Sequence, residues 1–377
     1  MEEAKGKGNE AVKAGDFAQA LDHYKQAIAI AVADPARADD LAALHSNCSF
    51  AHLKLGQLIE ALDEAIKSVH ANSKWSKAHF RCGEVYFAMR DYARAEEAYA
   101  QAAQLSPADE TIGRKLRLTR EAVNGNFYFR QLLAGRDFCL NPGNIIETQI
   151  FNAGAQMQNY VYLVGDAKTR EAVVVDPAWD VKGIKAFADA EHIKLVGAVA
   201  THYHFDHTGG PPPPPFDRLM IKLPGVRQLA VEDNLPIYVN KHDAGTIKTK
   251  NEVPAQSIVE LDDLSTVMVG SVKLEFIHTP GHTPGSQCIR INRAPAEDIL
   301  ISGDTLFISS CGRLDLPDCS VEAMYTSLQK KLASLPDSTR VYPGHNYGGP
   351  STSIANEKKH GFLRPMSERE WLQQHRL

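Results

Sequence analysis

The chain has 377 residues, of which 44% are hydrophobic, and this content can supply the cores of more than one domain. With 46 acidic and 41 basic residues, its formal net charge of −5 gives no electrostatic basis for binding nucleic acid. The charged start of the chain lacks the apolar core of a signal peptide, and no segment is apolar over the length of a membrane span. Six scattered cysteines without a C-x-x-C pair are typical of reduced thiols. We therefore predict a cytoplasmic multidomain protein that binds neither nucleic acid nor a membrane.

Three segments in the first third of the chain share one pattern of alanines and aromatic residues. The segments are 15–24, 56–65 and 90–99. The equivalent residues Ala61 and Ala95 lie 34 positions apart, which is a typical period for stacked helical hairpins. Each hairpin of such an array buries its apolar face only against its neighbours. We therefore predict an all-α domain over residues 1–123, with three repeats and a capping helix, followed by a connector over residues 124–144. The connector is expected to be a short packing helix and then a turn.

A cluster of metal-ligand side chains follows the apolar segment Leu195–Ala200, which we expect to be a buried strand. The run Thr201–His207 contains three histidines and an aspartate. An extended backbone points the first two histidines to the same side, and the following turn can aim the aspartate and the last histidine at a second point. Unpaired buried imidazoles and carboxylates are costly, so a metal site explains this run better than a chance histidine-rich loop. The candidate ligands are His202, His204, Asp206 and His207.

Three further candidate ligands stand at later glycine turns. His282, Asp304 and His345 each follow an apolar, strand-like run. Loop tips on a rigid sheet are where binding groups are usually held. The seven candidates are too many for one tetrahedral ion and suit two ions that share a carboxylate. Five prolines, Pro211–Pro215, follow the first motif and predict a stiff polyproline II loop beside the site. A docking ligand for a proline-binding domain is the less favoured interpretation of that loop.

The pattern His-x-His-x-Asp-His, followed by a lone His, Asp and His, resembles the metallo-β-lactamase superfamily over residues 145–347. The resemblance implies an α/β domain with an αββα sandwich over residues 145–377. It implies that one metal is held by His202, His204 and His282, the other by Asp206, His207 and His345, with Asp304 bridging the two. It also implies that Asp176 supports the ligand histidines, although a turn residue before Pro177 is the simpler alternative.

The N-terminal repeats resemble the tetratricopeptide repeats of co-chaperones. Lys5 and Asn9 are one turn apart on the first expected helix, and so share a face. Lys77 and Arg81 repeat that spacing on the first helix of the third unit, and Asn47 lies on the inner helix of the second. The resemblance implies a carboxylate clamp for the acidic C-terminal tails of heat-shock chaperones, bound by charge-assisted hydrogen bonds. A solvated helix face is the alternative.

Within the superfamily, the turns around Asp304, Arg313 and His345 resemble the glyoxalase II group, which hydrolyses glutathione thioesters. The resemblance implies two divalent ions, zinc with iron or manganese as alternatives, that activate water. It also implies that Asp206 and Asp304 take part in catalysis and that Arg313 recognises the substrate anion. The substrate expected from this group is a thioester or another glutathione derivative.

Three departures weaken that substrate assignment. Arg313 replaces the lysine of the glyoxalase II group, Asp315 replaces its tyrosine, and the chain after His345 is short. Persulfide dioxygenases share the Cys-Gly-Arg-x-Asp run, and they hold one iron through two histidines and a carboxylate matching His202, His282 and Asp304. Gly344, where that group usually carries alanine, and Phe205 count against them. We therefore predict a thioester hydrolase, with a mononuclear iron persulfide dioxygenase as the alternative. A nonenzymatic scaffold would tolerate lost ligands, and none is lost.

Overall fold

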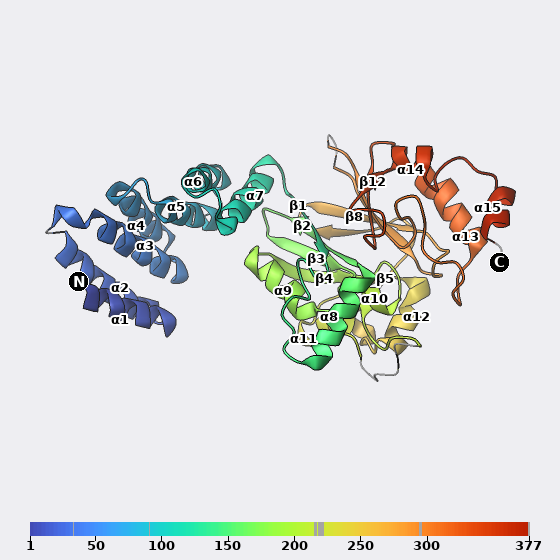
Figure 1. Cartoon of the computed structure of the whole chain (residues 1–377), viewed down its shortest axis with the longest axis horizontal. Helices are drawn as coiled ribbons and strands as arrows, with labels where there is room; N and C mark the ends of the chain where they lie inside the picture. Colours follow the sequence, from blue (N-terminus) through green and yellow to red (C-terminus); the bar gives the residue numbers. More distant parts are fainter. Residues whose placement is uncertain (33, 90, 215–216, 218–221, 294–295, 376–377) are drawn as a thin grey trace. The chain divides into compact units, whose positions relative to one another are not determined.

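The chain divides into an all-α unit, Met1–Asn126, and an α/β unit, Phe127–Leu377 (Figure 1). The computed structural model describes the whole chain except residues 33, 90, 215–216, 218–221, 294–295 and 376–377. This arrangement confirms the predicted fold class. Among the helices in the described residues, none combines the length and the apolar composition that crossing a bilayer requires.

Three helical hairpins and a last helix form the first unit. The helices are α1 (Glu2–Lys13), α2 (Phe17–Ala31), α3 (Ala38–Lys54), α4 (Leu58–Ala71), α5 (Ser76–Ala88), α6 (Tyr92–Leu105) and α7 (Glu110–Asn124). The repeat pattern has a direct packing cause, because small residues let the helices of a hairpin approach. A Cβ atom added at Gly8 would lie 2.5 Å from the Tyr24 ring, and one added at Gly83 would lie 2.6 Å from the Tyr99 ring. The first and third hairpins thus use the same glycine and tyrosine contact.

Two six-stranded sheets form the second unit. Their orders are β1-β2-β3-β4-β5-β6 and β12-β11-β10-β9-β8-β7. The first sheet contains β1 (Phe127–Leu133), β2 (Tyr160–Asp166), β3 (Glu171–Val175), β4 (Lys194–Val199), β5 (Ile237–Asn240) and β6 (Ile258–Leu261). The second contains β7 (Ser265–Val269), β8 (Val272–His278), β9 (Gln287–Ile291), β10 (Ile299–Gly303), β11 (Arg340–Pro343) and β12 (Thr352–Ser353). Neighbours β3 to β6 run parallel, as do β10 and β11, and the other pairs are antiparallel.

Alternating side chains place the second sheet between two apolar layers. Ile289 and Ile299 join a core with residues of the first sheet, including Val164. The adjacent residues on the same strands, Cys288 and Leu300, face the opposite side and join a separate core with the C-terminal helices. This period of two makes the sheets pack face to face while helices cover their outer sides. The helices of this unit are α8 (Ile145–Met157), α9 (Val181–Ala190), α10 (Phe205–Thr208), α11 (Val226–Glu232), α12 (Lys241–Lys250), α13 (Val321–Thr326), α14 (Ile354–His360) and α15 (Glu368–His375).

The predicted connector helix is wrong. Residues Phe127–Leu133 form strand β1, which pairs antiparallel with β2 over its whole length. The pairing with β2 decides this conformation, because the local sequence carries no clear period of two. The first unit therefore leads almost directly into a sheet, and the region predicted as a connector lies mainly inside the second unit.

The proline loop is partly described. Paired backbone hydrogen bonds of 2.9 Å between Gly210 and Leu223 close its base directly after the histidine motif. Residues 211–214 lie between them at the surface, whereas Pro215 lies outside the described residues. The predicted polyproline II conformation of Pro211–Pro215 therefore stays a prediction.

Candidate metal centre

The seven candidate ligands meet at the ends of strands that belong to both sheets. His202 and His204 follow β4, Asp206 and His207 lie on α10, His282 follows β8, Asp304 follows β10, and His345 follows β11. All except His204 are buried, with exposed fractions of 8% or less. The fold thus collects, at one edge of the sandwich, residues that are up to 143 positions apart.

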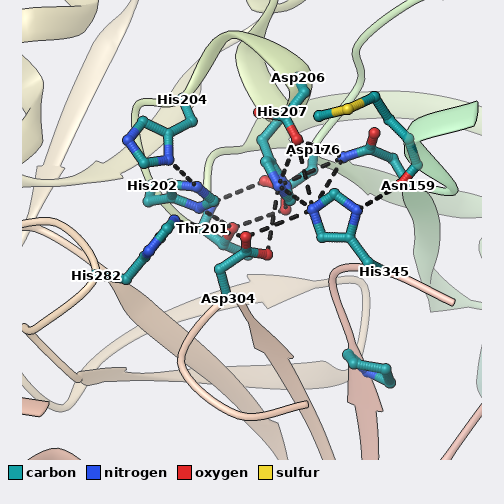
Figure 2. Close-up of polar contacts among 12 residues, drawn as sticks. Asn159, Asp176, Thr201, His202, His204, Asp206, His207, His282, Asp304 and His345 are labelled. Atoms are coloured by element: carbon teal, nitrogen blue, oxygen red, sulfur yellow. Dashed lines mark hydrogen bonds and ion pairs between the residues drawn. The ribbon is translucent and has the colours of Figure 1, made fainter. Parts of the chain in front are cut away.

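The ligand atoms include two groups that share no residue, and a third set, His202, His207 and Asp304, overlaps both (Figure 2). The first group consists of His202, His204 and His282, and the second of Asp206, His207 and His345. Within each group the ligand atoms lie within 4.8 Å of one another. In the first, His202 Nε2 is 3.1 Å from His204 Nδ1. In the second, the Nε2 atoms of His207 and His345 are 3.2 Å apart.

Asp304 lies between the two groups. Its Oδ1 is 3.4 Å from His207 Nε2, and its Oδ2 is 3.5 Å from both His282 Nε2 and His345 Nε2. A glycine makes room for this carboxylate, because a Cβ atom added at Gly344 would lie 2.3 Å from Asp304 Oδ1. The arrangement lets one carboxylate face both groups.

Four ligand imidazoles have their outward nitrogens paired with oxygen acceptors. His207 Nδ1 donates to Asp176 Oδ2 at 2.9 Å, and the Nδ1 atoms of His282 and His345 donate at 2.8 Å to backbone oxygens. His202 Nδ1 lies 3.0 Å from Thr201 Oγ1, whose own hydrogen goes to Asp176 Oδ2. Backbone and carboxylate oxygens can only accept, and the Thr201 hydroxyl gives its own hydrogen to Asp176, so each of these rings carries its proton on the outer nitrogen. The inner nitrogen of the neutral ring then offers a lone pair to the centre.

Two observations show that this donor set fits cations. His282 Nε2 and Asp304 Oδ1 are buried, and neither has a hydrogen-bond partner. Buried polar atoms are rarely left without a partner, so each needs an explanation. The inward lone pairs of His207 and His345 would also repel each other unless a cation or a proton lies between them. Imidazole nitrogens with carboxylate oxygens are ligands typical of zinc and iron.

The pKa directions differ between the two groups. Burial and the neighbouring imidazoles hold the pKa of His202 well below its usual value, and burial lowers the pKa of His204 to about 4. For His207 and His345, burial acts in the same direction, but nearby carboxylates, Asp304 first, outweigh it and raise the pKa of both. His202 and His204 therefore keep free lone pairs at neutral pH, whereas His207 and His345 lie where positive charge is favoured.

Two residues that the sequence did not reveal connect the ligand loops. Asn159, directly before β2, donates from Nδ2 to Asp206 Oδ2 at 3.0 Å. Asp243 on α12 accepts from Tyr203 N at 3.0 Å, which lies between the first two ligand histidines. It also accepts from Thr283 Oγ1 at 2.8 Å and Gly285 N at 2.7 Å, beside the third. An aspartate three residues after a strand carries no sequence signal for this role.

Arg313 lies at the exposed rim of the centre. Its backbone oxygen accepts the hydrogen bond from His282, so its main chain supports a ligand. Its guanidinium binds both oxygens of Asp315, at 2.9 and 2.7 Å. A substrate anion would have to share or replace that pair. On the other side, the Tyr347 ring stacks on His345 with centroids 4.6 Å apart.

The predicted clamp residues of the first unit lie on the first helix of each hairpin. Lys5 and Asn9 lie on α1, Asn47 on α3, and Lys77 and Arg81 on α5. Asn9 Oδ1 accepts from the Tyr24 hydroxyl at 2.8 Å, and Lys5 Nζ lies 3.9 Å from an Asp40 oxygen.

Lys77 is exposed, whereas Arg81 is more enclosed. The Arg81 guanidinium lies over the Phe50 ring at 4.8 Å and pairs with Glu84. The structure therefore orders Arg81 more than the other cations of this set.

Comparisons with known proteins agree with both units. The pattern of the metallo-beta-lactamase superfamily matches residues 154–345, and that of the tetratricopeptide repeat matches residues 76–109. The probable polyketide biosynthesis zinc-dependent hydrolase PksB of Bacillus subtilis is 28% identical over 56% of this chain and 84% of its own. The mitochondrial persulfide dioxygenase ETHE1 of Bos taurus is 30% identical over 60% of this chain and 80% of its own.

Several crystal structures resemble the chain, and two of them serve as examples. A metallo-beta-lactamase from Staphylococcus aureus is 26% identical, covers 67% of this chain and 68% of its own, and superposes with a TM-score of 0.52. ETHE1 from Myxococcus xanthus is 26% identical, covers 65% of this chain and 88% of its own, and superposes with a TM-score of 0.50.

Fold and site together define an α/β sandwich with a candidate metal centre of histidines and aspartates at one edge of its sheets. The chain belongs to the metallo-beta-lactamase superfamily, and it carries a tetratricopeptide repeat in its N-terminal unit.

Proposed function

We propose that the second unit is a hydrolase that uses two divalent cations and cleaves a thioester. The observation that carries this proposal is the position of Asp304, which faces both ligand groups. That position depends on the missing side chain at Gly344. Persulfide dioxygenases, which use one iron, usually carry alanine there, and its Cβ would displace the Asp304 oxygen that faces His207. Zinc is the favoured cation, and the zinc-dependent hydrolase PksB is a relative in keeping with it.

Each residue of this centre would bind a cation, orient the substrate or move a proton. Bound divalent cations would lower the pKa of a water molecule and polarise the substrate carbonyl. Burial alone would favour the neutral acid of Asp206, but His207 holds its pKa below the usual range, so it is ionised. Asp206 can then accept the proton that the water gives up as its oxygen bonds to the acyl carbon. The carbon–sulfur bond breaks, and the departing thiolate takes up the proton that Asp206 accepted, which returns Asp206 to its ionised form. Arg313 at the rim would bind the substrate carboxylate in exchange for Asp315.

A persulfide dioxygenase is the second candidate. The relatives named persulfide dioxygenase ETHE1 and ETHE1 support it, at 30% and 26% identity. The paired Arg313 and Asp315 also match the Cys-Gly-Arg-x-Asp run of that group. His202, His282 and Asp304 would hold the single iron, and open positions would remain for oxygen.

Metal content and two assays separate the candidates. Protein expressed without added metal is analysed for elements per chain, then tested for thiol release from acyl thioesters and for oxygen uptake with a glutathione persulfide. Two equivalents of zinc with thiol release support the hydrolase. One equivalent of iron with oxygen uptake overturns it in favour of the dioxygenase.

We further propose that the repeats bind an acidic chain-terminal peptide, such as the tail of a heat-shock chaperone. The first helix of each hairpin contributes a cationic or amide side chain, such as Lys5, Asn47 and Arg81. Side chains of this kind can donate charge-assisted hydrogen bonds to a terminal carboxylate and a neighbouring acidic side chain. The match of a tetratricopeptide repeat to residues 76–109 places Lys77 and Arg81 inside a recognised repeat.

A further inference from the structure

The side-chain amide of Asn159 faces the second ligand group. Its Nδ2 atom lies 3.0 Å from Asp206 Oδ2, 3.4 Å from His207 Nε2 and 3.5 Å from His345 Nε2 (Figure 2). Asn159 is only 2% exposed, and its backbone forms an isolated bridge with His345. The amide is therefore held in place on the inner side of the centre.

An indole fixes which end of the amide faces the ligands. Trp179 Nε1 donates to Asn159 Oδ1 at 3.1 Å. An indole nitrogen can only donate, so the amide oxygen must face Trp179 and the NH2 group must face the ligands. Trp179 is itself enclosed: its exposed fraction is 2%, and a Cβ atom added at Gly154 would lie 3.0 Å from its ring. The amide therefore cannot rotate without losing this hydrogen bond.

The three ligand atoms of the second group form a triangle with sides of 3.2, 3.4 and 3.4 Å. Since Asn159 Nδ2 lies at a similar distance from each corner, it caps one face of that triangle. Its hydrogens point the positive end of an N–H dipole at the atoms that would bind a cation. The first group differs, because His282 Nε2 has no hydrogen-bond partner.

We propose that Asn159, oriented by Trp179, is a positioning residue that weakens cation binding at the second group and so makes loading stepwise. The first group, with Asp304, fills first. The second fills only when a cation competes successfully with the amide hydrogens for Asp206 Oδ2. This inference rests on the centre with two cations proposed above, and it adds an order of filling to that centre.

The order in which the two groups bind cations is tested by titrating the metal-free full-length chain with Zn²⁺. Calorimetry with a competing chelator follows the titration. In the wild type we expect two binding steps of unequal affinity. Trp179→Phe removes the indole N–H and frees the amide to turn its oxygen toward the ligands, and Asn159→Ala removes the amide. Each variant should raise the affinity of the second step about tenfold, because the cation no longer competes with the amide hydrogens for Asp206 Oδ2. Loss of a group that supports a ligand would change the affinity in the opposite direction. The first step should change much less.

Asn240→Ala is the matched control. Asn240 is a buried asparagine of the same unit whose side chain accepts from His242 N, so its loss should leave the ratio of the two affinities unchanged. If Asn159→Ala instead weakens the second step, the amide supports binding and the proposal is wrong. An unchanged ratio in both test variants also overturns it. A third outcome separates the two proposals. If the wild type binds one cation and both variants bind two, the native centre does not hold two cations, but Asn159 does oppose binding at the second group.

Discussion

The proposed binding sites of the two units are built in opposite ways. In the second unit, six of the seven candidate ligands are buried. Four of the five imidazoles have an outer nitrogen paired with an oxygen acceptor, as His207 has with Asp176 and His345 with Met157. In the first unit, the clamp side chains stand on helix faces, and Lys77 is exposed. One site is an interlocked network, and the other is a row of separate contacts.

The difference follows from what each site must hold. A cation needs several donors at short and fixed distances, so the fold must pay the cost of burying them before the cation arrives. A peptide tail brings its own hydrogen-bonding groups and can adjust to side chains that remain in water. We therefore expect a single substitution to disable the metal centre, and substitutions of the predicted clamp residues to weaken peptide binding additively.

Asp304→Ala should break the metal centre most completely. Asp304 faces both groups, so its loss should remove activity and reduce the bound cations from two per chain to one or none. Elemental analysis of the purified variant measures this. The circular dichroism of the first unit's helices should persist, and an unchanged metal content would contradict the bridging role.

Lys77→Ala combined with Arg81→Ala should weaken binding of an acidic chaperone-tail peptide by roughly a hundredfold, because two partners of charged groups are lost. Titration calorimetry with the peptide measures the effect. The control variant, Lys25→Ala with Arg94→Ala, removes the same charge from α2 and α6 and should bind normally. Equal affinity in the test and control variants would exclude Lys77 and Arg81 as clamp residues.

Gly344→Ala sharpens the comparison inside the metal centre. The added Cβ would displace Asp304 Oδ1, so the second cation should bind about tenfold to a hundredfold more weakly while the first is retained. The φ angle of Gly344 lies outside the left-handed region, so alanine fits its backbone. Zinc titration of the metal-free variant decides. Retention of both wild-type affinities would show that Asp304 does not need this space.

Asp243→Asn should give the smallest effect, on stability. Burial raises the pKa of Asp243 to about 6, so the folded chain holds this proton more tightly than the unfolded chain does. Between pH 4 and 6 the wild type should therefore lose stability as pH rises, by up to about 3 kcal/mol, because an ionised carboxylate replaces the neutral acid. The asparagine variant cannot ionise at this position, so its stability should not show this loss as pH rises.

Urea unfolding of both metal-free proteins across this pH range measures the difference. Parallel pH profiles would mean that the three donors around Asp243 compensate for its burial.

All seven candidate ligands could be named from the sequence, because each metal-ligand residue type stands at a turn after an apolar run. The clamp residues stay a prediction, which rests on the resemblance of the repeats to those of co-chaperones. Asn159 and Trp179 could not be named from the sequence, since their contact depends on backbone geometry at positions where sequence gives no signal. Trp179 and Asp176 both have positive φ angles, 74° and 55°, although neither is glycine.

Strand β1 was missed for a related reason. In Phe127–Leu133, three consecutive residues, Phe129–Gln131, are only half-buried, so neither face of the strand is plainly apolar. Its conformation comes from the edge of β2, which lies about 30 residues further along the chain. Tertiary pairing of this kind outweighs local preference.

The space beside Asp304 has an evolutionary consequence. Every glycine codon becomes an alanine codon by one base change, so the hydrogen at position 344 is a single mutation away from a methyl group. If that methyl group moves the shared carboxylate, a lineage can pass between centres with two cations and with one while all seven ligands stay in place. Inventories of ligand residues would then fail to separate hydrolytic from oxidative members, and the residue before the last histidine would be the informative position to compare.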